Sequence, residues 1–229
     1  MKKASKKYLF RSAFTLLELV FVIVVIGILA AVIIPNTRTN PLQEAAIQLV
    51  SHIRYTQHLA MVDDKFDVNN SKWYKERWQL IFSNGAETGN QEAYSIFADT
   101  AGTSTGNVNS SEVALNPQNS SQLMSGGFSG AANALNITHD DFIGMTKLNL
   151  GRSYGVTNVA FNDGCSTARR IAFDYLGRPI QGNLRTTTSA YHTTSQRLVV
   201  NDCNIVLTDG NNNVTITIRP ETGYASIRF

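Results

Sequence analysis

The sequence is poor in the residues that build catalytic and metal sites. It has only two cysteines and four histidines among its 229 residues. Cys165 and Cys203 have no nearby histidine, which argues against a zinc site. No serine or cysteine stands in a nucleophile-elbow motif, and no glycine-rich phosphate-binding motif is present. We therefore expect no catalytic residue, no metal ion, no cofactor and no enzymatic activity.

Three short polar stretches need a closer look. His139–Asp141 could be an acid–base or metal cluster, but an exposed turn is favoured because no second cluster accompanies it. Asp209–Asn213 begins like a calcium loop, yet it lacks the later acidic ligand, and Asp-Gly between two β-like runs favours a hairpin turn. Asp67–Ser71 fits an extended acidic glycosylation sequon of bacterial N-glycosylation systems, with Asn69 as the acceptor.

Charged residues are also few, at 16% of the chain, and they are unevenly placed. Five of the twenty lysines and arginines lie in the first thirteen residues, with no acidic residue among them. Residues 36–145 carry 6 basic and 11 acidic side chains, whereas residues 146–229 carry 9 basic and 5 acidic. Such asymmetry can mark an anion-binding face, but a solvated mixed surface is the favoured explanation.

A long apolar run is present at Phe14–Ile34. As a helix, 21 residues span about 31 Å, which matches a bilayer core. The basic residues before it predict a cytoplasmic N-terminus and place the rest of the chain across the membrane. A cleaved secretory signal would have a shorter apolar region. A plain signal anchor leaves Glu18 unexplained, because a carboxylate within a membrane costs about 2.5–3.5 kcal/mol.

The stretch AFTLLELVFVIVVIGILAAVIIP resembles the leader junction and N-terminal helix of type IV pilins and type II secretion pseudopilins. The resemblance implies cleavage by a prepilin peptidase between Ala13 and Phe14, followed by N-methylation of Phe14. It also implies that Glu18 neutralises the N-terminal amine of a neighbouring subunit during filament assembly. Pro35 matches the helix-breaking proline of the family, which implies a helix kink there. The family has glycine before the cut, so we expect Ala13 to slow processing.

A second helix is predicted beyond the apolar run. Asn40 has the character of an N-cap, Pro41 of a first helical residue, and Gln43 stands three residues after the cap. Apolar residues then follow helical spacing, which predicts a buried stripe and a helix that ends near Met61–Asp64. The stripe consists of Leu42, Ala45, Ala46, Leu49, Ile53 and Ala60.

The remainder is rich in short β-like runs separated by turn residues, which predicts an antiparallel sheet or small β-sandwich. The expected strands are Arg77–Phe82, Ala93–Ala98, Val156–Phe161, Arg170–Tyr175, Arg197–Val200, Asn204–Thr208, Val214–Arg219 and Tyr224–Phe229. Asp99–Asn136 is dominated by Gly, Ser, Asn, Thr and Ala, and we expect a mobile loop or a variable surface insertion there. The predicted fold class is α+β and pilin-like: a long N-terminal helix, half membrane and half amphipathic, packed on the sheet.

Two C-terminal stretches extend the resemblance to the GspH/FimT group of minor pseudopilins and minor pilins. RRIAFDYLGRPI and VTITIRPETGYASIRF resemble its paired strand motifs, with glycine turns at Gly177 and Gly223. Some members bind DNA through arginines near such a turn, which makes Arg178 and Arg185 candidates for a DNA contact. Solvated surface arginines are the competing explanation, because phosphate binding normally requires several clustered basic residues.

Cys165 and Cys203 both follow the apolar run and would share an oxidising compartment, so we expect a disulfide between them. The expected organisation is a leader at 1–13, a transmembrane helix at 14–35, an amphipathic continuation at 36–64 and a periplasmic β-rich domain at 65–229 with a flexible loop around 99–136.

We expect a minor pseudopilin in the bacterial inner membrane that assists protein export. Its partners would be other pilin or pseudopilin subunits, prepilin peptidase and the inner-membrane assembly platform. The alternatives are a minor type IV pilin for pilus assembly, adhesion or DNA uptake, and a signal-anchored periplasmic enzyme or sensor.

Overall fold

The computed structural model describes residues 15–33, 40–101, 104–165, 169–190 and 197–228. The chain divides into two compact units, Met1–Thr39 and Asn40–Phe229. In the first unit the structure describes helix α1 (Leu16–Ile33). Its large apolar side chains are exposed, from 37% at Val25 to 81% at Leu16. No helix in the described part of the chain is long and apolar enough to cross a membrane.

The second unit contains the long helix α2 (Pro41–Val62). The sequence signals for its start are confirmed: the Asn40 side-chain oxygen accepts a hydrogen bond from the Gln43 backbone N–H at 3.2 Å, and Pro41 opens the helix. All six residues of the predicted stripe are buried. The expected continuation of one helix through residues 34–39, with Pro35 at the kink, lies outside the described residues.

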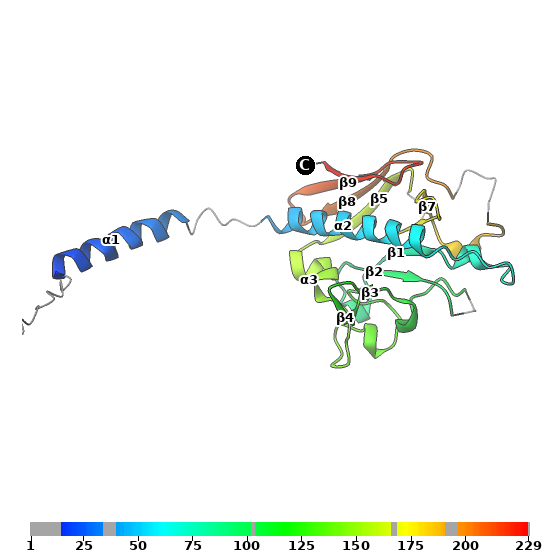
Figure 1. The fold of residues 1–229 in the computed structure, drawn as a ribbon, viewed down its shortest axis with the longest axis horizontal. Helices are drawn as coiled ribbons and strands as arrows, with labels where there is room; N and C mark the ends of the chain where they lie inside the picture. The colour runs from blue at the N-terminus through cyan, green and yellow to red at the C-terminus, as the bar shows by residue number, and fades with distance from the viewer. Residues whose placement is uncertain (1–14, 34–39, 102–103, 166–168, 191–196, 229) are drawn as a thin grey trace, which may run out of the picture. The chain divides into compact units, whose positions relative to one another are not determined.

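Two four-stranded antiparallel sheets cover α2. The first has the order β2-β1-β6-β7 and the second the order β10-β9-β8-β5. Figure 1 shows α2 running between them, with β8 and β9 on one side and β1 and β2 on the other. The strands are β1 (Trp78–Ser83), β2 (Ala93–Ala98), β5 (Asn158–Asp163), β6 (Arg170–Phe173), β7 (Pro179–Gln181), β8 (Cys203–Thr208), β9 (Asn213–Ile218) and β10 (Ala225–Arg228). The α+β class with antiparallel sheets is therefore confirmed.

Two details of the strand prediction are wrong. The expected strand Arg197–Val200 is not formed, and Leu198 makes only an isolated bridge to Ile180. Ile180 belongs to β7, a strand that is absent from the prediction. Pro179 is compatible with this strand because it is the first residue.

The segment between β2 and β5 contains the hairpin β3 (Leu115–Asn116) and β4 (Asn119–Leu123) and the short helix α3 (Leu150–Tyr154). Of the two expectations for 99–136, a mobile loop or a surface insertion, the described residues form an insertion with its own secondary structure and buried side chains. Its large buried apolar side chains, each at most 7% exposed, are Val108, Val113, Leu123, Met124, Phe128 and Leu135.

The insertion also explains why β2 is not an open edge. Gly126 N–H donates to the Tyr94 carbonyl at 3.0 Å, and Ile96 N–H donates to the Met124 carbonyl at 2.9 Å. An uncovered edge strand would leave such backbone groups free to pair with another chain. The polar insertion therefore completes the first sheet.

Candidate functional site

Glu18 lies in the first turn of α1 and is the only acidic residue of that helix. Its backbone N–H donates to the Thr15 hydroxyl oxygen at 3.2 Å, which gives the helix a side-chain cap. The partial positive charge of a helix N-terminus favours an acid at this position. Among the described residues, Glu18 has no cationic partner. An exposed carboxylate therefore stands alone on an otherwise apolar helix.

Three other predicted site residues, Ala13, Phe14 and Pro35, lie outside the described residues. Cleavage at Ala13, N-methylation of Phe14 and a kink at Pro35 stay predictions. Asn69 is described: it is exposed, and its N–H donates to the Asp67 carboxylate at 2.8 Å in a tight turn.

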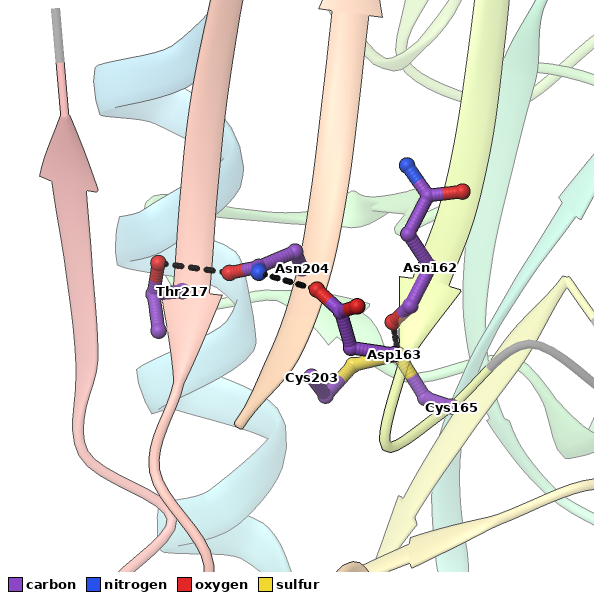
Figure 2. Close-up of a disulfide and its surroundings, with 6 residues drawn as sticks. All are labelled: Asn162, Asp163, Cys165, Cys203, Asn204 and Thr217. Atoms are coloured by element: carbon purple, nitrogen blue, oxygen red, sulfur yellow. Dashed lines mark hydrogen bonds between the residues drawn. A yellow bond between two sulfur atoms is a disulfide. The ribbon is translucent and has the colours of Figure 1, made fainter. Parts of the chain in front are cut away.

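The predicted disulfide between Cys165 and Cys203 is confirmed. It links the residues just after β5 to the first residue of β8, and both sulfur-bearing side chains are fully buried (Figure 2). Beside it, Asn204 donates to the Asp163 carboxylate at 2.6 Å and accepts from the Thr217 hydroxyl at 2.7 Å. This row of polar side chains joins three neighbouring strands, so we assign the region a structural role.

The two glycine turns found in the sequence meet at one glutamine of α2. The Gln57 side-chain NH₂ group donates to the Gly177 carbonyl and to the Thr222 carbonyl, both at 2.8 Å. Gly177 and Gly223 have positive φ angles of 78° and 62°. A Cβ atom at Gly223 would lie 2.5 Å from the Gly177 carbonyl oxygen. Glycine is therefore required for the close approach of the two hairpins.

The structure gives Arg178 a local role in the turn after β6. Its Nε donates to the buried carboxylate of Asp174 at 2.7 Å, and its backbone N–H donates to the same carboxylate at 2.8 Å. The Asp174 carboxylate raises the pKa of the Arg178 guanidinium. Arg185 is exposed, and its carbonyl accepts from the Lys75 ammonium at 2.9 Å. The ion pair between Arg178 and Asp174 therefore stabilises the turn that contains Gly177.

A cavity of about 230 Å³ lies beside this turn. Three arginines line it, Arg77, Arg178 and Arg197, whereas Arg185 does not. Ile180, Leu184 and Leu198 also line it and belong to a small apolar cluster separate from the main core. Sequence reasoning missed this site because Arg77 and Arg197 come from opposite ends of the domain and no local motif contains them.

The two polar stretches His139–Asp141 and Asp209–Asn213 were also candidate sites in the sequence. His139 Nδ1 lies 3.4 Å from the Asp141 carboxylate, and both side chains are exposed. Asp209 accepts hydrogen bonds from the N–H groups of Asn211 and Asn212 in the turn between β8 and β9, which confirms the predicted hairpin. Within the described ranges, no group of three or more His, Cys, Asp or Glu side chains could hold a metal ion.

No family model, curated protein or solved structure matches this chain.

Proposed function

We propose that this protein is a minor pseudopilin of the GspH/FimT kind, a structural subunit of a type II secretion pseudopilus in the bacterial inner membrane. Its leader would be cut between Ala13 and Phe14 by prepilin peptidase, and Phe14 would be N-methylated. The subunit would then join other pseudopilins at the inner-membrane assembly platform, with the domain from residue 40 onward in the periplasm. A minor type IV pilin is the related alternative.

The observation that carries the proposal is Glu18 on the exposed apolar surface of α1. A helix that is apolar all round needs an apolar environment, either lipid or other protein. A lone carboxylate is costly there unless a cation pairs with it. The α-amine of a neighbouring subunit, freed by cleavage before Phe14, is a cation that would be present only in an assembled filament.

Two further features support the proposal. Helix α2 packs on two antiparallel sheets, which agrees with the architecture expected of a pilin-like periplasmic domain. The disulfide between Cys165 and Cys203 agrees with an oxidising compartment such as the periplasm.

The test replaces Glu18 by Gln, Leu and Asp in cells that carry the remaining filament subunits. We expect the Gln and Leu variants to insert in the membrane and lose their leader but not to be cross-linked to other subunits, whereas Asp restores part of the incorporation. Gly27→Ala is the matched control in the same helix, since an added Cβ there meets no atom within 4 Å.

Processing has its own measurement. Mass spectrometry of the mature protein should find N-methylated Phe14 as the first residue. An intact Met1, with no cross-links between the wild-type protein and other filament subunits and no effect of Glu18→Leu, would overturn the proposal and favour a signal-anchored enzyme or sensor. Binding of DNA by the 40–229 fragment, lost in Arg178→Ala and Arg185→Ala, would favour the alternative role in DNA uptake.

A further inference from the structure

The cavity beside the Gly177 turn combines cationic and apolar walls. Tyr74 and Arg77 reach it from the segment that leads into β1, and Arg178 and Ile180 from the hairpin between β6 and β7. Leu184, Thr187, Ser189 and Ala190 follow from the chain after β7, and Arg197 and Leu198 also line the cavity. Four separate stretches of sequence thus converge on one small cavity.

The positive charge of these walls exceeds their negative charge. Asp174 is the only carboxylate among the described residues that line the cavity, and it is paired with Arg178 at 2.7 Å. Arg197 donates to the Asn183 carbonyl and to the Thr186 hydroxyl, both neutral groups, and has no acidic partner among the described residues. The Arg77 guanidinium lies 5.2 Å from the Trp73 ring centroid and donates to the Ala190 carbonyl at 3.2 Å. An anion in this cavity would therefore meet the Arg197 guanidinium, which forms no ion pair with a carboxylate of the described residues.

The uncharged part of the wall is mixed: Tyr74, Thr187 and Ser189 add hydroxyl groups, and the remaining lining residues are apolar. Ile180 and Leu184 are only 3% and 2% exposed and form a small cluster with Ala172 and Leu198, apart from the main core. A hydrated inorganic anion would gain nothing from these side chains. A nucleic-acid strand is bound by an extended basic groove with stacking aromatic side chains, and a cavity of about 230 Å³ suits a far smaller group.

We propose that this cavity binds a carboxylate that carries an apolar group of about the size of one side chain. Arginine matches a carboxylate through two parallel hydrogen bonds, and burial of the apolar group against Ile180, Leu184 and Leu198 supplies the hydrophobic contribution. The ligand is either a free aromatic acid or the last residue of a polypeptide with its terminal carboxylate. This binding site goes beyond the proposed filament role and does not depend on it.

The test uses the full-length protein in a nonionic detergent and isothermal titration calorimetry with three probes. These are benzoate, the tripeptide Ala-Ala-Phe with a free carboxylate, and the same tripeptide with a C-terminal amide. We expect saturable one-site binding of at least one carboxylate probe and at least tenfold weaker binding of the amide. A peptide at least tenfold tighter than benzoate identifies a chain terminus as the source, and the opposite order identifies a free acid.

Matched variants locate the site. Arg197→Gln should weaken the carboxylate probe about tenfold, the size of one charge-assisted hydrogen bond. Arg185→Gln removes the same charge from the neighbouring turn without lining the cavity, so it should change affinity less than about twofold and only through screened, long-range attraction. Ala190→Phe should abolish binding by filling the space while keeping every arginine. Thermal unfolding of each variant checks that it is folded. If Arg197→Gln does not fold, Ala190→Phe still tests the cavity.

Three results would overturn the proposal. The first is no saturable binding of either carboxylate up to about 10 mM, the weak limit of specific binding. The second is a lack of specificity. It would appear as equal affinity for the acid and the amide, or as an equal loss of affinity in Arg185→Gln and Arg197→Gln. The third is displacement of the bound carboxylate probe by an oligothymidylate, which would assign the cavity to nucleic acid.

Discussion

The hydroxyl group of Tyr94 lies 2.6 Å from Nδ1 of His52. Gln48 donates its side-chain N–H to the same hydroxyl oxygen at 3.0 Å. A neutral His52 imidazole accepts the Tyr94 hydroxyl proton at Nδ1. Burial lowers the pKa of His52 from 6.5 to about 4.

The first prediction is a loss of stability at mildly acidic pH. The unfolded chain takes up a proton at His52 near pH 6.5, whereas the folded protein takes it up near pH 4. Stability from the neutral histidine is therefore complete above pH 6.5 and falls as the pH drops to about 4, by up to about 3 kcal/mol. Urea unfolding of the 40–229 fragment between pH 4 and 8 measures this change.

His52→Gln is the control for this pH dependence, because glutamine can accept from Tyr94 without titrating. Burial raises the pKa of Asp99, which makes stability fall with rising pH in the acidic range, so the difference between wild type and variant is the quantity to compare. A pH profile unchanged by His52→Gln would contradict the assignment of a neutral His52.

The second prediction concerns the disulfide. Cys165 and Cys203 are separated by 38 residues, and cross-linking a loop of that length stabilises a fold by about 4 kcal/mol in the chain-entropy model. The Cys165→Ser and Cys203→Ser double variant should lose about that much free energy of unfolding. Addition of a thiol reductant to the denatured wild-type fragment before refolding should give the same value, and a difference below about 1 kcal/mol would show that the bond is dispensable.

The third prediction compares two neighbouring positions of α2. Leu49 is fully buried in the core, whereas Ile47 is 53% exposed. Leu49→Ala should destabilise the fragment by about 3 kcal/mol through lost burial and a residual cavity. Ile47→Ala should change the free energy of unfolding by about 0.5 kcal/mol or less. Chemical denaturation distinguishes the two, and similar losses at both positions would refute the packing of α2.

The fourth prediction tests the insertion at a glycine. A Cβ atom at Gly126 would lie 2.3 Å from the backbone carbon of Leu148, although this glycine has no positive φ angle. Gly126→Ala should therefore cost about 3 kcal/mol by forcing the two backbones apart. Gly130 has open space but a φ of +77°, so Gly130→Ala should cost only about 1 kcal/mol in backbone strain. Thermal unfolding gives the comparison, and the reverse order would show that the insertion is not packed as described.

The parts of the fold that could be predicted are those specified by residues close together in the sequence. The start of α2 was predicted from the N-cap Asn40 and from Pro41, and its buried face was predicted from the apolar stripe. The strands of both sheets except β7 were predicted to within a few residues because β-branched and aromatic residues are frequent in them. Cys165 and Cys203 offered a single pairing.

The insertion was not predictable in the same way, because its composition is that of a loop and its order comes from tertiary pairing with β2. The sequence NSSQL of β4 has no apolar alternation, yet β4 pairs with β3, and Met124 directly after it bonds to Ile96 of β2. The cavity was missed for a related reason. Its arginines are 120 residues apart, and nothing local marks Arg197 as a partner of Arg77.

The position of α2 also has a kinetic consequence. This helix is made early in synthesis, yet its hydrogen-bond partners come much later. Arg54 donates to the Ala225 carbonyl, 171 residues further on. Gln57 donates to the Thr222 carbonyl, 165 residues further on. Its apolar stripe cannot be covered fully until the hairpin of β9 and β10 has been made. Such long sequence separations slow folding and leave apolar surface open to aggregation in the meantime. The nascent chain should therefore depend on a holding chaperone for most of its synthesis.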